Sequence, residues 1–286
     1  MKSEEKKINS ILVFAIIFIF VFVAALIFFS TGEKNNSNIS TGGLTVNFGG
    51  NKSLKSDNYF NFNISIKNNY DIDLKELNIW LESGSLFAFM NSSLRTSTNI
   101  FIEELRKNST ITYFIPNIKT EKVYSEMKSV PIYVNILYKL VLDIPLIITV
   151  SRNDTLELYG GLSNMGVKYQ KKKSPLLFYL KFSNTDFVFK GNNSASFELE
   201  IKNSKIGNCS NITIQIISNP NLSCKILNST YKGNFKVEVP FKDLIKLSCI
   251  YDIGYLERKD FDTQNFSLVI SCKYLERKTI YFNILP

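Results

Sequence analysis

Histidine is absent from this 286-residue chain. Without histidine there is no Ser-His-Asp or Cys-His nucleophile pair, no histidine-ligated metal and no imidazole base. The spacings HExxH, GxxxxGK[ST], GxGxxG and GxSxG are also missing. Only carboxylate pairs, a Ser-Lys dyad or lysine chemistry would remain for an enzyme. We therefore expect no enzymatic activity, no catalytic residue, no metal site and no cofactor.

Arginine is scarce, although the net charge is +9. Recognition of phosphate or bases favours the bidentate guanidinium group, so we expect no nucleic-acid partner. The abundant lysines indicate a solvated surface, with weak attraction to an anionic envelope or lipid surface as the functional alternative. The arginines are Arg95, Arg106, Arg152, Arg258 and Arg277.

Proline and glycine are also scarce, at 7 and 13 residues, whereas 45% of the chain is hydrophobic and it contains 23 Phe and 14 Tyr. This composition argues against a low-complexity linker protein. The part of the chain beyond residue 43 is long enough for one or two domains that each bury a core.

Residues 11–29 (ILVFAIIFIFVFVAALIFF) contain no charge, proline or hydroxyl group. A helix of this length spans about 28 Å, close to the roughly 30 Å hydrocarbon core of a bilayer. The run predicts a transmembrane helix, so a lipid bilayer is an expected partner. A cleaved signal peptide is the alternative, but its apolar region is shorter and ends in a small-x-small site.

The flanks of this run predict its orientation. Residues 1–7 (MKSEEKK) carry a small positive excess, whereas residues 30–34 (STGEK) carry none. The positive-inside rule therefore places the N-terminus in the cytoplasm and residues 30–286 outside the cell. Residues 30–43 are polar and lack apolar periodicity, which is typical of a flexible tether.

The chain contains thirteen Asn-x-Ser/Thr sequons, more than random order of these residues would give, and all follow the apolar run. Glycosylation is our interpretation, and an asparagine-rich composition is the alternative. Asn63 lies on the polar side of an alternating segment, so a glycan there would stand clear of the core. The sequons are Asn35, Asn38, Asn51, Asn63, Asn91, Asn108, Asn153, Asn192, Asn208, Asn211, Asn221, Asn228 and Asn265.

The four cysteines, Cys209, Cys224, Cys249 and Cys272, all lie in the last third of the chain. An even number outside the cytoplasm indicates two disulfides, and the absence of CxxC argues against a zinc ribbon. The sequence leaves three pairings open. If Cys209 opens a strand beside the one that ends near Cys272, these two pair and Cys224 pairs with Cys249. Proximity along the chain would instead pair Cys209 with Cys224 and Cys249 with Cys272.

Short alternating runs separated by turn signals follow the tether. They predict an all-β chain made of two tandem immunoglobulin-like antiparallel sandwiches behind one transmembrane helix. Residues 85–90 are ambiguous between a strand and a turn, and residues 120–128 between a loop and a helical turn. The predicted strands are 44–48, 59–67, 76–81, 109–114, 130–138, 144–150, 176–182, 187–189, 196–202, 211–217, 223–227, 234–239, 244–251, 266–274 and 279–285.

Residues 160–174 (GGLSNMGVKYQKKKS) interrupt this pattern, and the sequences on either side repeat at an offset of 135 or 136. Residues 62–68 match 197–203, residues 77–81 match 212–216, and residues 132–138 match 268–274. We therefore expect two copies of one fold. The predicted division is a cytoplasmic stub 1–10, a transmembrane helix 11–29, a tether 30–43, a first sandwich 44–159, a linker 160–174 and a second sandwich 175–286.

Three features carry a family resemblance: the strand ending in IKNN at 66–69 or IKNS at 201–204, the asparagine-rich loop after it, and a closing pattern of a strand ending in Tyr, a turn and a last strand. They resemble immunoglobulin-like surface modules of archaeal envelope proteins, including the CARDB type. The resemblance implies adhesion, scaffolding or display, and no catalytic residues. The paired cysteines of antibody domains are missing from the first half. Archaeal pilins also place an apolar helix before a β-domain, but their processing site is absent before residue 11.

Several charged or aromatic residues are weaker candidates. The pair Asp71 and Asp73 could bind calcium, although a full site needs six to eight oxygens. Trp80 is expected to pack in a core or interface, with ligand stacking as the alternative. The pentapeptide YLERK occurs at 255–259 and again at 274–278, where it predicts a charged turn rather than a binding motif. Solvated loop charges are expected at Glu103, Glu104, Asp260, Asp262 and Lys171, Lys172 and Lys173.

These observations favour a membrane-anchored, N-glycosylated envelope protein that displays two domains to a protein or envelope-glycan partner. An accessory subunit of a membrane secretion or surface-appendage complex is the alternative. A carboxylate-based envelope glycosidase is the third hypothesis, and it requires a deep cleft lined by two acids.

Overall fold

The computed structural model describes residues 43–83, 87–89, 99–124, 126–152, 154–189, 194–218, 220–253 and 261–286. Of the two compact units into which the chain divides, Met1–Asn38 and Ile39–Pro286, only the second contains described residues. The predicted transmembrane helix and nearly all of the tether lie outside them. Within the described ranges, no helix is long and apolar enough to cross a bilayer.

The described part of the chain is all β, apart from short 3-10 turns, which confirms the predicted class. Each half of the chain has one sheet of its own, which we call its front sheet. The front sheet of the first half has the order β1-β3-β7-β5, and that of the second half has the order β10-β12-β18-β15-β16. Their strands are β1 (Leu44–Gly49), β3 (Tyr59–Asn68), β7 (Thr110–Thr120) and β5 (Phe87–Phe89), then β10 (Leu176–Phe182), β12 (Ser194–Asn203), β18 (Leu244–Asp252), β15 (Leu222–Ile226) and β16 (Ser229–Lys232).

A third sheet, which we call the shared sheet, contains strands from both halves of the chain in the order β17-β14-β19-β8-β4-β6. Four short strands add to it, and the turns η1 (Leu156–Tyr159), η2 (Leu162–Asn164) and η3 (Asn184–Phe187) flank it. The main strands are β17 (Phe235–Pro240), β14 (Asn211–Ile217), β19 (Phe261–Leu285), β8 (Lys128–Arg152), β4 (Leu74–Ser83) and β6 (Ile100–Leu105); the short ones are β2 (Ser53–Lys55), β9 (Gly166–Tyr169), β11 (Val188–Phe189) and β13 (Gly207–Asn208).

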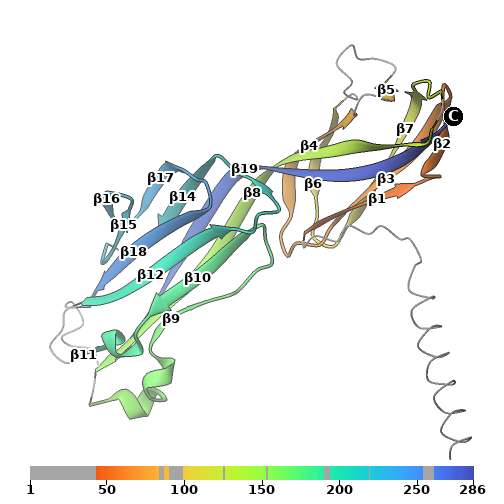
Figure 1. Ribbon diagram of the computed structural model, residues 1–286. Coiled ribbons are helices and arrows are strands. Elements are labelled where there is room, and N and C mark those ends of the chain that lie inside the picture. The colour runs from red at the N-terminus through yellow and green to blue at the C-terminus, as the bar shows by residue number, and fades with distance from the viewer. Residues whose placement is uncertain are drawn as a thin grey trace, which may run out of the picture. The chain divides into compact units, whose positions relative to one another are not determined.

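The two longest strands, β8 and β19, pair antiparallel along almost their whole length (Figure 1). The register runs without a shift from Phe261 opposite Ser151 to Ile284 opposite Lys128. First-half strand β4 pairs with the beginning of β8, whereas second-half strand β14 pairs with the beginning of β19. The β8–β19 ribbon therefore belongs to both halves.

Each half is completed by the end of the other half's long strand. In the first half, β2 pairs in parallel with the C-terminal end of β19, from Asn283 to Leu285. In the second half, β11 pairs in parallel with the C-terminal end of β8, at Ser151 and Arg152. This is a strand exchange within one chain, with each last strand donated across the boundary.

The side-chain pattern explains why β8 does not turn back on itself. Its buried hydrophobic residues fall on even numbers throughout: Val130, Ile132, Val134, Ile136, Tyr138, Leu140, Leu142, Ile144, Leu146, Ile148 and Val150. A hairpin would place Leu140 and Leu142 in its turn, at a cost of about 1.5–3 kcal/mol for each leucine exposed to water. Residues 139–143 (KLVLD) also contain no glycine, asparagine or proline, and Asp143, at the end of the segment, is their one residue that is common in turns.

The expected turns near residues 139–143 and 274–278 are therefore wrong. Predicted strands 130–138 and 144–150 form the single strand β8, and predicted strands 266–274 and 279–285 form the single strand β19. Residues 274–278 lie inside β19, and alternation continues through them because Tyr274, Glu276 and Lys278 all face inward.

The halves share one topology, as the sequence repeat predicts. Asn68 Nδ2 donates to the Ile72 carbonyl at 2.8 Å, and Asn203 Nδ2 donates to the Gly207 carbonyl at 2.9 Å. Both asparagines are buried, and each also accepts a backbone N–H two residues on. The repeated Ile-Lys-Asn sequence therefore marks equivalent turns that end β3 and β12.

The predicted linker 160–174 also contributes to the sheet, because its strand β9 pairs with β8. Its lysine run makes three hydrogen bonds. The Lys173 amide donates to Asp71 Oδ2 at 2.7 Å, the Asp71 amide donates to the Lys173 carbonyl at 3.0 Å, and Lys172 Nζ donates to the Asp143 carbonyl at 2.7 Å. The predicted division groups residues 279–285 with the second sandwich, but in the structure this stretch lies beside the beginning of β8.

Candidate functional sites

The crossing cluster consists of Tyr70, Tyr138, Glu276 and Lys278, which are buried where the two halves meet. Glu276 is 0% and Lys278 5% exposed. The Tyr70 and Tyr138 hydroxyls each donate to Glu276 Oε1 at 2.7 Å. Lys278 Nζ lies 3.3 Å from Glu276 Oε2 and forms an ion pair without a well-aligned hydrogen bond.

This arrangement compensates for the burial of a carboxylate. An unpaired ionised group in the core would be strongly destabilising. Here two phenol donors and an ammonium group stabilise the Glu276 carboxylate. Burial, and secondly the Glu276 carboxylate, raises the pKa of both Tyr70 and Tyr138, so these side chains remain protonated donors. Because Glu276 is fully buried, the cluster can stabilise the crossing, by which we mean the place where β8 and β19 pass from one half to the other. A substrate could not contact Glu276 there.

Tyr274 is the residue of the second half that corresponds to Tyr138 in the sequence repeat. Its hydroxyl donates to Asn203 Oδ1 at 2.8 Å and accepts the Gly207 amide at 3.1 Å. The Tyr138 and Tyr274 rings contact each other with centroids 5.6 Å apart. Glycine is required at position 207, because an added Cβ would lie 2.2 Å from the Leu275 carbonyl oxygen.

The second YLERK copy is thus a strand segment with two different faces. Glu276 and Lys278 face inward, whereas Arg277 faces outward. Arg277 Nε donates to Asn135 Oδ1 at 2.8 Å, its guanidinium lies 4.9 Å from the centre of the Tyr133 ring, and it forms an ion pair with Glu82. The first copy, at 255–259, lies outside the described residues.

The cluster predicts a loss of stability in alkali. The pKa of an unfolded tyrosine is about 10, and the pKa of folded Tyr70 and Tyr138 is higher. The stabilisation is therefore complete below about pH 10 and is lost above it, because the unfolded chain releases protons that the folded chain retains. Each tyrosine contributes a slope of up to about 1.4 kcal/mol per pH unit.

Urea unfolding between about pH 8 and pH 11 measures this slope. We expect Tyr138→Phe to make the alkaline decline shallower, whereas Tyr281→Phe, at an exposed position on β19, leaves the slope unchanged. An equal decline in both variants would contradict the assigned role of Tyr138.

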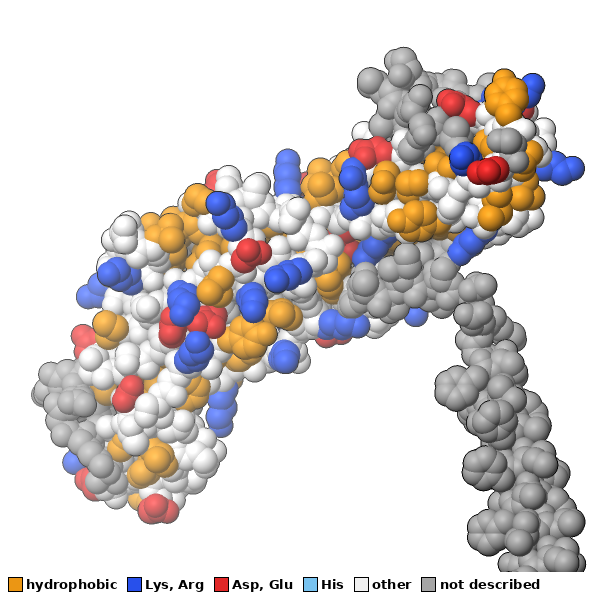
Figure 2. Space-filling model, in the orientation of Figure 1, with side chains coloured by type: hydrophobic (Ala, Val, Ile, Leu, Met, Phe, Trp, Pro, Cys, Tyr) orange, Lys and Arg blue, Asp and Glu red, His pale blue; other side chains and the backbone are white. Residues whose placement is uncertain are grey.

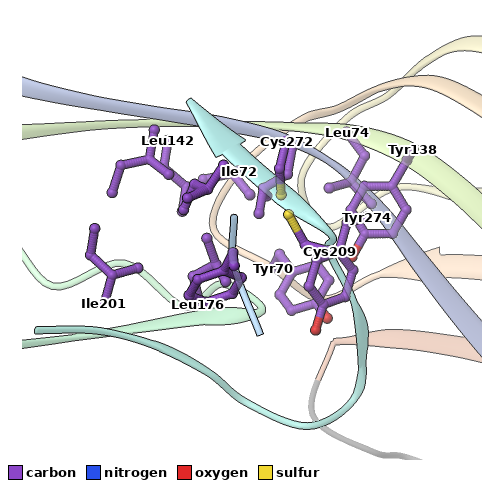
Figure 3. Close-up of a cluster of buried hydrophobic side chains, with 14 of the residues drawn as sticks. Tyr70, Ile72, Leu74, Tyr138, Leu142, Leu176, Ile201, Cys209, Cys272 and Tyr274 are labelled. Carbon is purple, nitrogen blue, oxygen red and sulfur yellow. The ribbon is translucent and has the colours of Figure 1, made fainter. Parts of the chain in front are cut away.

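The cysteines form one disulfide and one pair of thiols. Cys224 and Cys249 are bonded and are directly opposite each other in β15 and β18. This bond excludes the pairing based on proximity along the chain. Cys209 and Cys272 are buried thiols whose sulfur atoms face each other (Figure 3).

Four of the other acidic candidates, Asp71, Asp73, Glu104 and Asp262, make structural bonds, and Asp262 is buried in β19 and is not the expected solvated loop charge. Asp71 accepts the Lys173 amide, and Asp73 Oδ1 accepts the Lys107 amide at 2.8 Å, so each carboxylate closes a loop. In the described ranges, no group of three or more Cys, Asp or Glu side chains lies close enough together to hold a metal ion. Glu104 pairs with Arg106 on the surface at 3.6 Å. Asp262 accepts a hydrogen bond from Gln264 at 2.8 Å, whereas Asp260 lies outside the described residues.

Trp80 lies half-buried on β4, with its Nε1 donating to Glu82 Oε1 at 3.0 Å. Leu77, Ile79 and Leu81 supply the buried face of this strand, as the alternation predicts. The indole therefore packs beside the Arg277 ion pair, since Glu82 is a partner of both residues.

Two grooves lie on the outer faces of the sheets. The larger, of about 750 Å³, covers the second front sheet and includes Asp186, Glu198, Lys181 and Lys225 among its lining. The smaller, of about 370 Å³, is lined by residues of both halves and includes Glu76 and Glu238. Glu76 pairs with Lys139 at 2.9 Å, and Glu238 accepts from Asn211 Nδ2 at 3.0 Å.

Charged side chains of both signs are interspersed on the face shown in Figure 2, as expected for a solvated surface. Among the sequons that the structure describes, only Asn221 is half-buried; the others are exposed, and Asn63 faces outward from β3 as predicted. The exposed ones are Asn51, Asn63, Asn108, Asn208, Asn211, Asn228 and Asn265. Outside the described residues lie Asn35, Asn38, Asn91, Asn153 and Asn192.

No known protein family and no curated protein matches the chain. Among solved structures, it is similar to a secreted serine protease of Vibrio cholerae (11% identity, TM-score 0.24, covering 81% of this chain and 51% of that one). It is also similar to an Escherichia coli alpha-2-macroglobulin (8%, 0.22, 85% and 33%) and to the C-terminal globular domain of a Pyrococcus abyssi oligosaccharyltransferase (8%, 0.20, 82% and 45%). The chain thus spans about half or less of these proteins. Likeness at these scores carries no argument about fold or function.

Proposed function

We propose that this chain is a single-pass membrane protein of the cell envelope that presents two immunoglobulin-like, CARDB-like sandwiches to a protein or glycan partner. The apolar run at residues 11–29 anchors it, with residues 30–286 outside the cell. It acts by display, scaffolding or adhesion and not as an enzyme. The archaeal character of this proposal rests on the sequence resemblance alone.

The observation that carries the proposal is that both ends of the described chain belong to the first half. Strand β1 begins at Leu44, directly after the tether, and the last residues of β19 pair with β2. The first half therefore takes the connection to the anchor. The second half has a groove of about 750 Å³ on its front sheet and is attached through the β8–β19 ribbon. We infer that the second half is the part presented to the partner.

The exposed sequons support an extracytoplasmic location. Glycans at any of the exposed asparagines could be added without displacing core side chains. The Cys224–Cys249 disulfide supports the same location, because disulfides persist in oxidising compartments.

The accessory-subunit alternative has one supporting observation. Tyr59, Phe101 and Phe114 of the first half are each about 60% exposed, which provides apolar side chains for contact with another protein. A carboxylate-based glycosidase is less favoured. It requires two acids across a groove, and the acids that line the two grooves are already bonded. In the smaller groove Glu76 pairs with Lys139 and Glu238 accepts from Asn211, and in the larger one Asp186 accepts from Ser196 and Glu198 pairs with Lys246.

Peptide mapping and intact-mass measurement of the full chain from its own membranes test the proposal. We expect glycans, with higher occupancy at the loop sequons Asn51, Asn108 and Asn228 than at Asn63 and Asn211, whose backbones are held in strands. Treatment of intact cells with protease should also remove the C-terminal part of the chain. Unmodified sequons together with a C-terminus accessible only from the cytoplasm would reject this function.

A further inference from the structure

Strand pairing holds Cys209 beside Cys272. Cys209 lies in the short connection between β13 and β14, and both of these strands pair with β19. On one side of it Asn208 is opposite Leu275, and on the other Thr213 is opposite Ser271. The part of β19 between these two contacts contains Cys272. The backbone is therefore fixed on both sides of each thiol.

The two thiols also interact directly. Cys209 is 4% and Cys272 7% exposed, and their sulfur atoms point toward each other among the buried side chains of the crossing (Figure 3). The Cys209 thiol donates a hydrogen bond to the Asn211 carbonyl oxygen, with Sγ and oxygen 3.0 Å apart. A hydrogen bond with Cys272 lowers the pKa of the Cys209 thiol, whereas this contact raises the pKa of Cys272.

We propose that Cys209 and Cys272 are a second disulfide site, which closes when the chain meets an external disulfide oxidant and locks β19 at the strand crossing. This rests on the extracytoplasmic location proposed above, where such oxidants are found. It selects one of the pairings that the sequence leaves open.

The chemistry is thiol–disulfide exchange. One of the two thiols loses its proton to water, and its thiolate attacks one sulfur of the oxidant, R–S–S–R, to form a mixed disulfide, and one R–S⁻ leaves. The other thiol then loses its proton to that thiolate or to water, and its sulfur attacks the protein sulfur of the mixed disulfide and expels the second R–S⁻. Both protein thiols are oxidised, and one oxidant molecule is reduced to two thiols.

The Cys209–Cys272 disulfide would stabilise the strand exchange. Strand β13 pairs with Leu275 and Glu276, the residues at which the sequence pattern predicts a turn. If β19 turned back there, the β13 pairing would be lost, and Cys209 would be held beside Cys272 only through the pairing of β14. A Cys209–Cys272 bond therefore favours the exchanged arrangement over a hairpin and protects the buried Glu276 next to it.

Non-reducing peptide mapping of the full chain tests this proposal, after extraction in N-ethylmaleimide to block free thiols. We expect peptides joined through both Cys209–Cys272 and Cys224–Cys249. Joined peptides for Cys224–Cys249, with Cys209 and Cys272 alkylated, would overturn the second bridge and leave the extracytoplasmic location intact. Alkylation of all four cysteines, or any other pairing, would overturn the bridge, and complete alkylation would count against the location as well.

A series of variants measures how much the Cys209–Cys272 disulfide raises the melting temperature. The oxidised full chain should melt about 10 °C above the Cys209→Ser/Cys272→Ser variant, because the bridge closes a long loop, and the difference should vanish in reductant. The matched control, Cys224→Ser/Cys249→Ser, should still form the Cys209–Cys272 bridge. A difference that persists unchanged in reductant would mean that packing, not the bridge, is responsible. If the serine variant does not fold, addition of oxidised glutathione to the reduced wild-type protein decides the question by bridge formation alone.

Discussion

Replacement of Glu276 by alanine is expected to lower the free energy of unfolding by about 3–5 kcal/mol. The substitution removes the acceptor of the Tyr70 and Tyr138 hydroxyls and the carboxylate paired with Lys278, all within the core. Buried donors that lose their acceptor incur their desolvation penalty. Urea unfolding of the detergent-solubilised full chain, followed by tyrosine fluorescence or circular dichroism, measures the change.

Two variants make this result specific. Glu276→Gln keeps an oxygen for both hydroxyls and loses only the charge, so it should be less destabilising than Glu276→Ala. Glu200→Gln removes a surface carboxylate that pairs with Lys181 and Lys246, and the midpoint should barely change. If Glu276→Ala and Glu200→Gln behaved alike, Glu276 would not stabilise the crossing.

The second large effect is expected at Gly207, whose replacement by alanine should cost about 3 kcal/mol. The new Cβ would lie 2.2 Å from the Leu275 carbonyl oxygen and 2.7 Å from the Tyr274 ring. The obstacle is backbone inside the β8–β19 ribbon, which cannot move without the loss of ladder hydrogen bonds. The amide of residue 207 would also lose its bond to the Tyr274 hydroxyl.

The matched control is Gly49→Ala. Its added Cβ would meet nothing closer than Asn63 Cβ at 3.6 Å, which is ordinary contact, so stability should change little. Hydrogen exchange of the Leu275 and Glu276 amides gives a second measurement, and we expect faster exchange in Gly207→Ala only. Wild-type exchange rates in both variants would show that β13 does not pack against β19 as described.

Much of the fold follows from the sequence because alternation alone specifies which side chains are buried. The bounds of β10 and β14 match the predicted strands 176–182 and 211–217, and β3 is one residue longer than its prediction. The IKN repeat correctly marks equivalent turns in both halves. Short strands such as β2 and β13 could not be predicted, since two or three residues show no periodicity.

The strand exchange was missed for a different reason. A hairpin and an exchanged ribbon bury the same face of the same residues, so alternation cannot distinguish them. Glu276 and Lys278 resemble turn residues because charged side chains rarely occupy core positions. The signal that could have revealed them is the unbroken even-numbered pattern of β8 and β19, which places both side chains inside. The Cys224–Cys249 pairing likewise depends on the register of β15 and β18, which the sequence does not specify.

The strand exchange is tested most directly by the distance between residues 133 and 149, both half-buried on the outward face of β8. Spin labels at Tyr133→Cys and Thr149→Cys, in a chain with serine at positions 209 and 272, report this distance by double electron–electron resonance. One continuous strand separates the two positions by about 50 Å. A hairpin that turned at residues 139–143 would bring their Cα atoms to about 5 Å. We predict the long distance; the short one would show that each half keeps its own last strand.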